Sequence, residues 1–223
     1  MIPFLQQNES EAWVHESFPV GPLQCNCTLI GDKVSGNALI IDPGGDPEFI
    51  FDRLKTLGLE RITGIIHTHA HLDHFLASAE MKRRTGAPLA LHRDDQFLWD
   101  SLEQQCAMVG VPYVPTPDPD HWIDDDVDLQ CCGGVSIHTP GHTPGSMCFW
   151  FAPANLLVAG DTLFFRSVGR TDLNGGDWRA LTRSIQHRLF TLDETALVIP
   201  GHGPTTTLGA EMRDNPFVGH NAA

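Results

Sequence analysis

The sequence lacks several features that would assign it to a familiar functional class. It contains no run of 18 apolar residues, so no transmembrane helix is predicted. Basic residues are few, 14 against 28 acidic residues, and the formal net charge is −14. Because an acidic surface repels phosphate backbones, nucleic acid is not an expected partner.

Two further absences concern the cysteines and the N-terminus. The six cysteines include no CxxC pair, and the spacings of Cys25 with Cys27 and of Cys131 with Cys132 are awkward for disulfides. Residues 1–13 show no basic region followed by an apolar run, so no signal peptide is expected. These features favour a cytoplasmic protein with reduced, partly buried thiols.

The remaining composition is that of a globular protein. Hydrophobic residues make up 41% and charged residues 19% of 223 residues, which is enough for a core that needs no disulfides. The length suits one sizeable domain or two small ones, and we expect a single domain over residues 1–223. No sequence feature specifies an oligomeric state.

Apolar patterning predicts strands and helices in alternation. Strands are expected at 27–30, 37–41, 61–66, 88–91, 134–138, 146–151, 155–159 and 196–199, and helices at 46–57, 75–84, 94–108 and 177–190. Residues 112–119 are expected to form a proline-rich loop, and the tail from residue 205 to contain one helical turn. Two inner sheets with outer helices give an α/β protein, specifically a four-layer αββα sandwich.

Seven potential metal ligands occur in a fixed order along the chain. His69, His71, Asp73 and His74 follow the predicted strand 61–66, and His142, Asp161 and His202 each follow an apolar run and a glycine-bearing turn. Ligands at the carboxyl ends of strands face a shared crevice in α/β proteins. Seven nitrogen and oxygen donors are too many for one tetrahedral ion and suit two ions that share a carboxylate. The pattern therefore predicts a hydrolase with two divalent ions. Zinc is the first expectation, and iron or manganese are alternatives with the same ligand types.

The pattern T-H-x-H-x-D-H, followed by G-H, G-D and G-H, resembles the metallo-β-lactamase superfamily over about residues 17–217. Residues 169–172, 176–177 and 199–204 resemble the glyoxalase II group, in the short bacterial form without a C-terminal helical domain. The resemblance implies that His69, His71 and His142 hold one ion, that Asp73, His74 and His202 hold the other, and that Asp161 bridges both.

The resemblance also implies a reaction. A metal-bridging hydroxide, oriented by Asp73, would attack a small-molecule thioester such as the glutathione conjugate S-lactoylglutathione. Arg170 stands where the group often has lysine, and it is the candidate for binding a substrate carboxylate. An internal ion pair to Asp161 or Asp172 is the alternative role of Arg170.

Other activities of the same superfamily remain open. A persulfide dioxygenase would use one iron, held here by His69, His142 and Asp161. β-Lactamases of this kind often carry cysteine in place of Asp161 and are exported, and neither feature is present. Asp42 is expected either to hydrogen-bond a ligand histidine or only to form a turn before Pro43. His67 is expected either to support the ligands or to be a strand-end histidine with no metal role.

Overall fold

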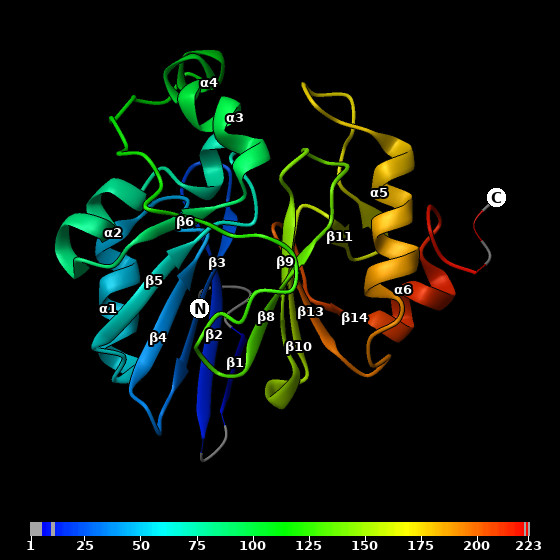
Figure 1. Ribbon diagram of the computed structural model, residues 1–223, viewed down its shortest axis with the longest axis horizontal. Helices are drawn as coiled ribbons and strands as arrows, with labels where there is room; N and C mark the ends of the chain where they lie inside the picture. The colour runs from blue at the N-terminus through cyan, green and yellow to red at the C-terminus, as the bar shows by residue number, and fades with distance from the viewer. Residues whose placement is uncertain (1–5, 10–11, 221, 223) are drawn as a thin grey trace. The chain divides into compact units, whose positions relative to one another are not determined.

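The computed structural model describes residues 6–9, 12–220 and 222. Residues 1–5 and 10–11, on which much of the signal-peptide prediction rests, lie outside the described residues. The chain forms two compact units, Met1–Ile123 and Asp124–Ala223, and each is described by itself. Strands and helices in both units confirm the predicted α/β class (Figure 1).

The first unit contains a seven-stranded sheet in the order of the sequence, β1 to β7. Its strands are β1 (Gln6–Glu9), β2 (Trp13–Val20), β3 (Cys25–Asp32), β4 (Asn37–Ile41), β5 (Arg61–Ile66), β6 (Leu89–Leu91) and β7 (His121–Trp122). Pairing is antiparallel from β1 to β4 and parallel from β4 to β7. The carboxyl ends of β4, β5 and β6 therefore meet at one edge of the sheet.

Helices cover one face of this sheet. They are α1 (Pro47–Leu57), α2 (Ser78–Thr85), α3 (Gln96–Asp100) and α4 (Leu102–Val109), with short 3₁₀ turns η1 (Leu72–His74) and η2 (Arg93–Asp95). Proline at the first position and Gly58, in the left-handed conformation, define the ends of α1. Its buried face, Ile50 and Leu54, packs in one core with Leu29 and Ile40 of the sheet.

The second unit contains a five-stranded sheet in the order β14-β13-β10-β9-β8 and a separate hairpin of β11 and β12. Its strands are β8 (Gly134–His138), β9 (Met147–Phe151), β10 (Leu156–Gly160), β11 (Leu163–Phe164), β12 (Ser167–Val168), β13 (Leu197–Pro200) and β14 (Thr206–Thr207). Its helices are α5 (Trp178–Ser184), which continues as the π-helix η4 (Ile185–Leu189), α6 (Leu208–Asp214) and the 3₁₀ turn η3 (Ala152–Ala154). Leu181, Leu189 and Leu208 from the helices share a core with Leu157 and Val198 of the sheet.

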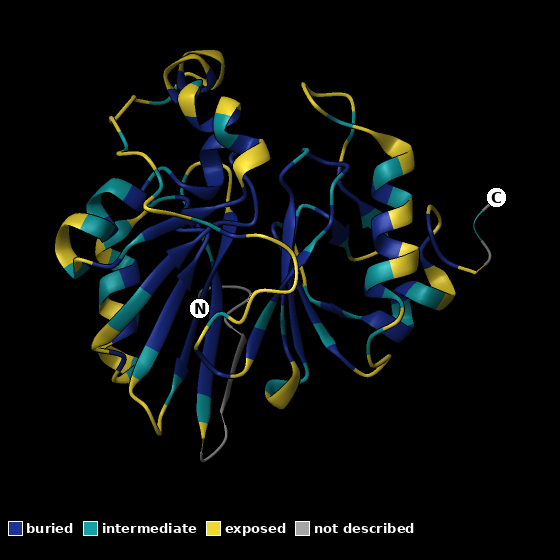
Figure 2. Cartoon of the chain, viewed as in Figure 1, coloured by how far each residue is buried: buried dark blue, intermediate teal, exposed yellow. Residues whose placement is uncertain are grey.

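Burial follows the layers within each unit. The strands of both sheets are mostly buried, whereas the helices expose their outer sides (Figure 2). Each unit thus supplies one large sheet and a set of helices that packs on it, which are the layer types that the sequence predicted. Among the described residues, no helix is both long and apolar enough to cross a bilayer.

Several element boundaries differ from the sequence prediction. Strand β2 was not predicted, although it pairs with β3 along its whole length. The helix expected at 94–108 is interrupted at Ser101, which ends α3. The helix expected to begin at residue 75 begins at Ser78. The tail contains the seven-residue helix α6 rather than a single turn.

Candidate metal centre

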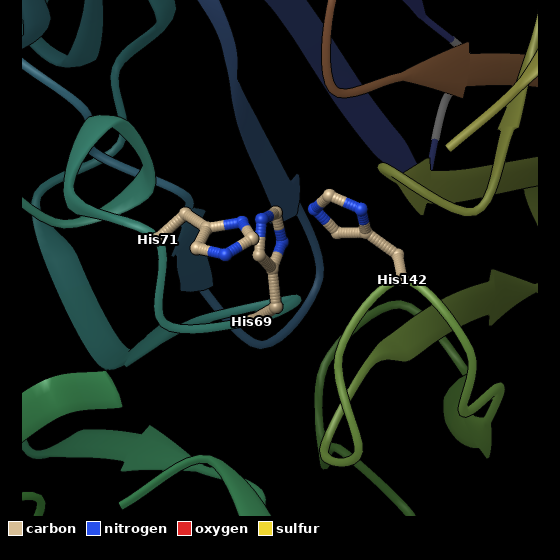
Figure 3. A group of neighbouring side chains, drawn as sticks. All are labelled: His69, His71 and His142. Atoms are coloured by element: carbon tan, nitrogen blue, oxygen red, sulfur yellow. The ribbon is translucent and has the colours of Figure 1, made fainter. Parts of the chain in front are cut away.

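The first group of donors lies just after β5 in the first unit. The backbone is extended at His71 and then turns through η1, which carries Asp73 and His74. The ring centroids of His69 and His71 are 4.8 Å apart, and those of His69 and His74 are 4.0 Å apart. The carboxylate of Asp73 lies 3.8 Å from Nε2 of His74. Figure 3 shows the side chains of His69 and His71 leaving the same loop. This unit therefore brings its four predicted donors together.

Asp42, at the end of β4, orients two of these histidines. Its Oδ2 lies 3.0 Å from Nδ1 of His74, and it accepts hydrogen bonds from the hydroxyl and the backbone N–H of Thr68. Since a carboxylate only accepts, Nδ1 of His74 carries the proton and Nε2 keeps the lone pair that a metal ion needs. The Thr68 hydroxyl, having donated to Asp42, accepts from Nδ1 of His69 at 3.1 Å. The first of the two roles considered for Asp42 is therefore the one that the structure supports.

Two neighbours of this group are not arranged as ligands. The Cys25 sulfur lies 3.4 Å from the protonated Nδ1 of His74, and burial raises the pKa of the Cys25 thiol to about 12. His67 bonds through its two ring nitrogens to the Ala90 carbonyl and the Ser78 hydroxyl. Burial lowers the pKa of His67 to about 4, so its ring is neutral. His67 therefore acts as a structural histidine at the end of β5.

The second group of donors lies at strand ends in the second unit. Strands β10 and β13 are parallel neighbours in which Gly160 pairs with Pro200. The Gly201 N–H donates to the Gly160 carbonyl at 2.8 Å. This register places Asp161 and His202, the residues that follow, side by side. His142 follows β8 through a turn, from a loop that is also drawn in Figure 3.

The distances within this second group suit metal ligation. Oδ2 of Asp161 lies 3.5 Å from Nε2 of His142, and Oδ1 lies 3.8 Å from Nε2 of His202. Two ligand atoms at about 2.1 Å from one tetrahedral ion are about 3.4 Å apart. The observed separations are close to this value and too long for hydrogen bonds. One carboxylate thus presents a separate oxygen to each histidine, which is the arrangement that a bridging ligand requires.

The backbone of residues 169 and 170 supports this group. The Arg170 carbonyl accepts from Nδ1 of His142 at 2.7 Å, which leaves the lone pair on Nε2. A Cβ added at Gly169 would lie 1.8 Å from the Asp161 carbonyl oxygen and 3.2 Å from Cβ of His142. Only glycine fits where the chain passes so close to two donors.

The Arg170 side chain adopts the internal pairing that the sequence left open. Its Nε and Nη2 each donate to Asp172 at 2.7 Å. The two side chains are 61% and 68% exposed, so the ion pair is screened by solvent and contributes little to stability.

The sequence predicted the seven donors but not most of the residues that hold them. Asp42 was considered because ligand histidines commonly have such partners, whereas Thr68 and the Arg170 carbonyl gave no signal. The donor set in each unit is imidazole and carboxylate, with burial of all but His71, Asp161 and His202. This chemistry fits divalent zinc, iron or manganese.

Comparison with known proteins agrees with this chemistry. A relative named hydroxyacylglutathione hydrolase GloC, from Haemophilus influenzae, is 37% identical over 207 residues, covering 91% of this chain and 97% of that protein. Two solved structures have a TM-score of 0.83. One is BLEG-1 B3 metallo-beta-lactamase (36% identity, 92% of this chain and 99% of that one), and the other is a di-iron-bound form of TTHA1623 (37% identity, 89% and 98%). ETHE1 from Myxococcus xanthus has a TM-score of 0.71 and 25% identity, covering 96% of this chain and 84% of that one.

The match to a family covers most of the chain. Residues 20–206 match the family described as the metallo-beta-lactamase superfamily. The resemblance inferred from the ligand motifs and the predicted fold class are thereby confirmed. The chain belongs to the metallo-β-lactamase superfamily and has its fold.

Proposed function

We propose that this protein is a metal-dependent thioester hydrolase that cleaves a 2-hydroxyacyl-glutathione such as S-lactoylglutathione. The observation that carries the proposal is the Asp161 carboxylate, which presents one oxygen to His142 and the other to His202. A relative that is 37% identical over nearly its full length is named a hydroxyacylglutathione hydrolase. The proposal treats residues 1–223 as one functional domain.

The seven donors are assigned to two ions. His69, His71 and His142 would hold one ion, Asp73, His74 and His202 the other, and Asp161 would bridge them. Two divalent ions bound there would supply a water of lowered pKa and would polarise the carbonyl of the substrate. Zinc is the first expectation, and a similar protein is known in a di-iron-bound form. Iron therefore stays in the proposal, and manganese stays because it is bound by the same ligand types.

The residues of the chain have defined tasks in this reaction. Asp73 would orient the attacking water as well as bind an ion. Asp42 and the Arg170 carbonyl keep His74 and His142 in the tautomer that presents Nε2. A thiolate leaving group needs little protonation, so the reaction requires no separate general acid.

Arg170 is proposed to bind a substrate carboxylate. Its partner Asp172 is exposed, and an exposed ion pair is easily exchanged for another. The guanidinium can offer a substrate carboxylate the same two donors that it now offers Asp172.

All six cysteines are buried and in no disulfide, which supports a reducing, cytoplasmic setting for the enzyme.

A second candidate is a persulfide dioxygenase. The likeness to ETHE1 from Myxococcus xanthus leaves room for this activity beside hydrolysis. It would need one iron, for which His69, His142 and Asp161 are the donors. The complete set of seven donors favours two ions and therefore hydrolysis.

The decisive experiment combines kinetics with metal analysis on one sample. The panel contains S-lactoylglutathione, the corresponding coenzyme A thioester, glutathione persulfide with an oxygen electrode, and a chromogenic cephalosporin. We expect hydrolysis of the glutathione thioester and close to two metal ions per chain. Oxygen uptake with one iron per chain would establish the second candidate instead. Cleavage of the cephalosporin alone would reject both.

A variant pair tests the ligand assignment. His71→Ala removes one donor and should lower turnover by several orders of magnitude. His187→Ala, on the exposed side of η4, is the matched control and should keep wild-type turnover. A correctly folded His71→Ala protein with the wild-type rate would refute the role of His71.

A further inference from the structure

A buried glutamine of α4 holds the loop that carries the first two histidines. Oε1 of Gln105 accepts from the Leu72 N–H at 2.9 Å, and its Nε2 donates to the Ala70 carbonyl at 3.1 Å. The second hydrogen of Nε2 is donated to the Leu98 carbonyl at 2.8 Å. Because every donor and acceptor of the amide has a partner, its orientation is defined.

Asp95 holds the same loop from η2. Its Oδ2 accepts from the Ala70 N–H at 3.1 Å. Asp95 is fully buried and Gln105 nearly so, at 0% and 6% exposure. Polar side chains are rarely so buried unless their hydrogen bonds matter for the structure. Both polar groups of Ala70 and the N–H of Leu72 are thus fixed by side chains from the segment 95–105.

The position of these contacts links them to the ligands. In extended backbone, residues two apart direct their N–H and C=O groups to the same side. Gln105 and Asp95 therefore occupy the place that a neighbouring strand would take along Ala70 and Leu72. Fixing these peptide groups fixes the peptide planes on both sides of His71. It thereby fixes the directions in which the side chains of His69 and His71 leave the backbone.

We propose that Gln105, together with Asp95, is a positioning residue that sets the affinity of the protein for the ion held by His69 and His71. The inference rests on the proposed function, because it assumes the metal assignment made there. The other ion is affected less, since Asp42 holds the ring of His74 independently of α4. Asp42 supports one histidine of each ion, whereas Gln105 and Asp95 hold only the backbone at Ala70 and Leu72.

The test compares two glutamines of the same helix. Gln105→Met keeps the volume of the side chain and removes its hydrogen bonds, and Gln104→Met changes an exposed neighbour. Metal-free proteins are titrated with Co²⁺ in competition with a chelator, and the visible absorption of the bound cobalt is recorded. We expect Gln105→Met to bind one of two ions about 10-fold more weakly or worse, as for other residues that orient ligands. The absorption spectrum of that ion should change, whereas Gln104→Met should match the wild type.

Other outcomes overturn the inference. Wild-type affinities and spectra in Gln105→Met would show that α4 does not position the ligands. Equal weakening of both ions would show that Gln105 acts through the general stability of the unit. If Gln105→Met does not fold, Asp95→Ala removes the hydrogen bond from the Ala70 N–H and should weaken the same ion. Wild-type binding in a folded Asp95→Ala protein would then count against the proposal.

The readout separates this inference from the proposed function. A wild-type protein that binds two Co²⁺ ions but hydrolyses no thioester would reject the proposed substrate and leave the role of Gln105 intact. A wild-type protein that binds no Co²⁺ would reject both. Hydrogen exchange of the Leu72 amide, faster in Gln105→Met than in Gln104→Met, reports the contact itself without any metal.

Discussion

Replacing Asp42 by asparagine should weaken the binding of both metal ions. Its carboxylate receives the Nδ1–H of His74 directly and that of His69 through the hydroxyl of Thr68. Oδ2 accepts two of these hydrogen bonds and Oδ1 accepts the Thr68 N–H. An asparagine amide has only one oxygen, so in either orientation an NH₂ group faces a buried donor.

The size of the effect follows from these contacts. An unsatisfied buried donor costs about 1–3 kcal/mol. If the NH₂ group faces His74, the imidazole is driven toward the tautomer with its proton on Nε2, where it cannot bind a metal ion. Partners that orient ligand histidines are worth about 10- to 100-fold in metal affinity, or about 1.4–2.7 kcal/mol per ion. The two ions should weaken together because one carboxylate supports a histidine of each.

The assay is competition for Zn²⁺ with a chromophoric chelator, at constant pH, on Asp42→Asn and on Asp52→Asn. Asp52 lies on the exposed side of α1 and controls for the loss of one negative charge. Urea unfolding of the metal-free proteins separates a general loss of stability from a loss of affinity. Unchanged dissociation constants for both ions in Asp42→Asn would refute the reasoning, and so would an equal loss in Asp52→Asn.

Three further predictions concern other parts of the molecule. Gly169→Ala places a Cβ 1.8 Å from the Asp161 carbonyl oxygen and should reduce metal content and turnover together. Arg170→Ala keeps the backbone carbonyl that supports His142 and should raise KM at unchanged metal content. Equal metal loss in both variants would contradict this prediction. His15 is buried in β2 against Trp13, and burial lowers its pKa from 6.5 to about 4. The His15 ring therefore binds a proton more tightly in the unfolded chain than in the folded one. The free energy of unfolding is highest above pH 6.5 and falls as the pH drops toward 4, by on the order of 2 kcal/mol at pH 5. Urea unfolding at pH 7 and pH 5 should show a smaller loss for His15→Phe than for the wild type. Dialysis against a chelator should abolish thioester hydrolysis, and Zn²⁺, Fe²⁺ or Mn²⁺ should restore it; full activity after dialysis would reject the metal assignment.

The sequence predicted elements whose burial follows a simple pattern. Strand β5 was predicted with the observed bounds because Ile62, Ile65 and Ile66 form a short apolar run that parallel neighbours cover. Strand β2 was missed because His15, Glu16 and Ser17 interrupt any apolar pattern, although all three are buried. The strand is held by pairing with β3 along its full length and by an ion pair of Glu16 with Arg53 of α1. Such partners come from distant parts of the chain and leave no local signal.

The break in the helix expected at 94–108 was not predicted, for a related reason. Residues 94–108 have a continuous helical pattern, but helix α3 ends at Ser101. The Ser101 hydroxyl donates to the Leu98 carbonyl. The same carbonyl receives Nε2 of Gln105. The break therefore belongs to the contacts that hold Ala70 and Leu72, and it depends on a loop about 30 residues earlier.

The ligand motif and its supports differ in what a sequence can record. A metal ligand must be one of the few side chains that bind metal ions, here histidine or aspartate, so its residue type and spacing identify it. A support needs only an acceptor in the right place, and that acceptor is a carboxylate for His74, a hydroxyl for His69 and a backbone carbonyl for His142. The backbone carbonyl of residue 170 is still present after a change of its side chain. Alanine at position 170 therefore tests only the proposed binding of a substrate carboxylate by the side chain. A change at Gly169 moves the backbone and exposes the role of the Arg170 carbonyl in holding His142.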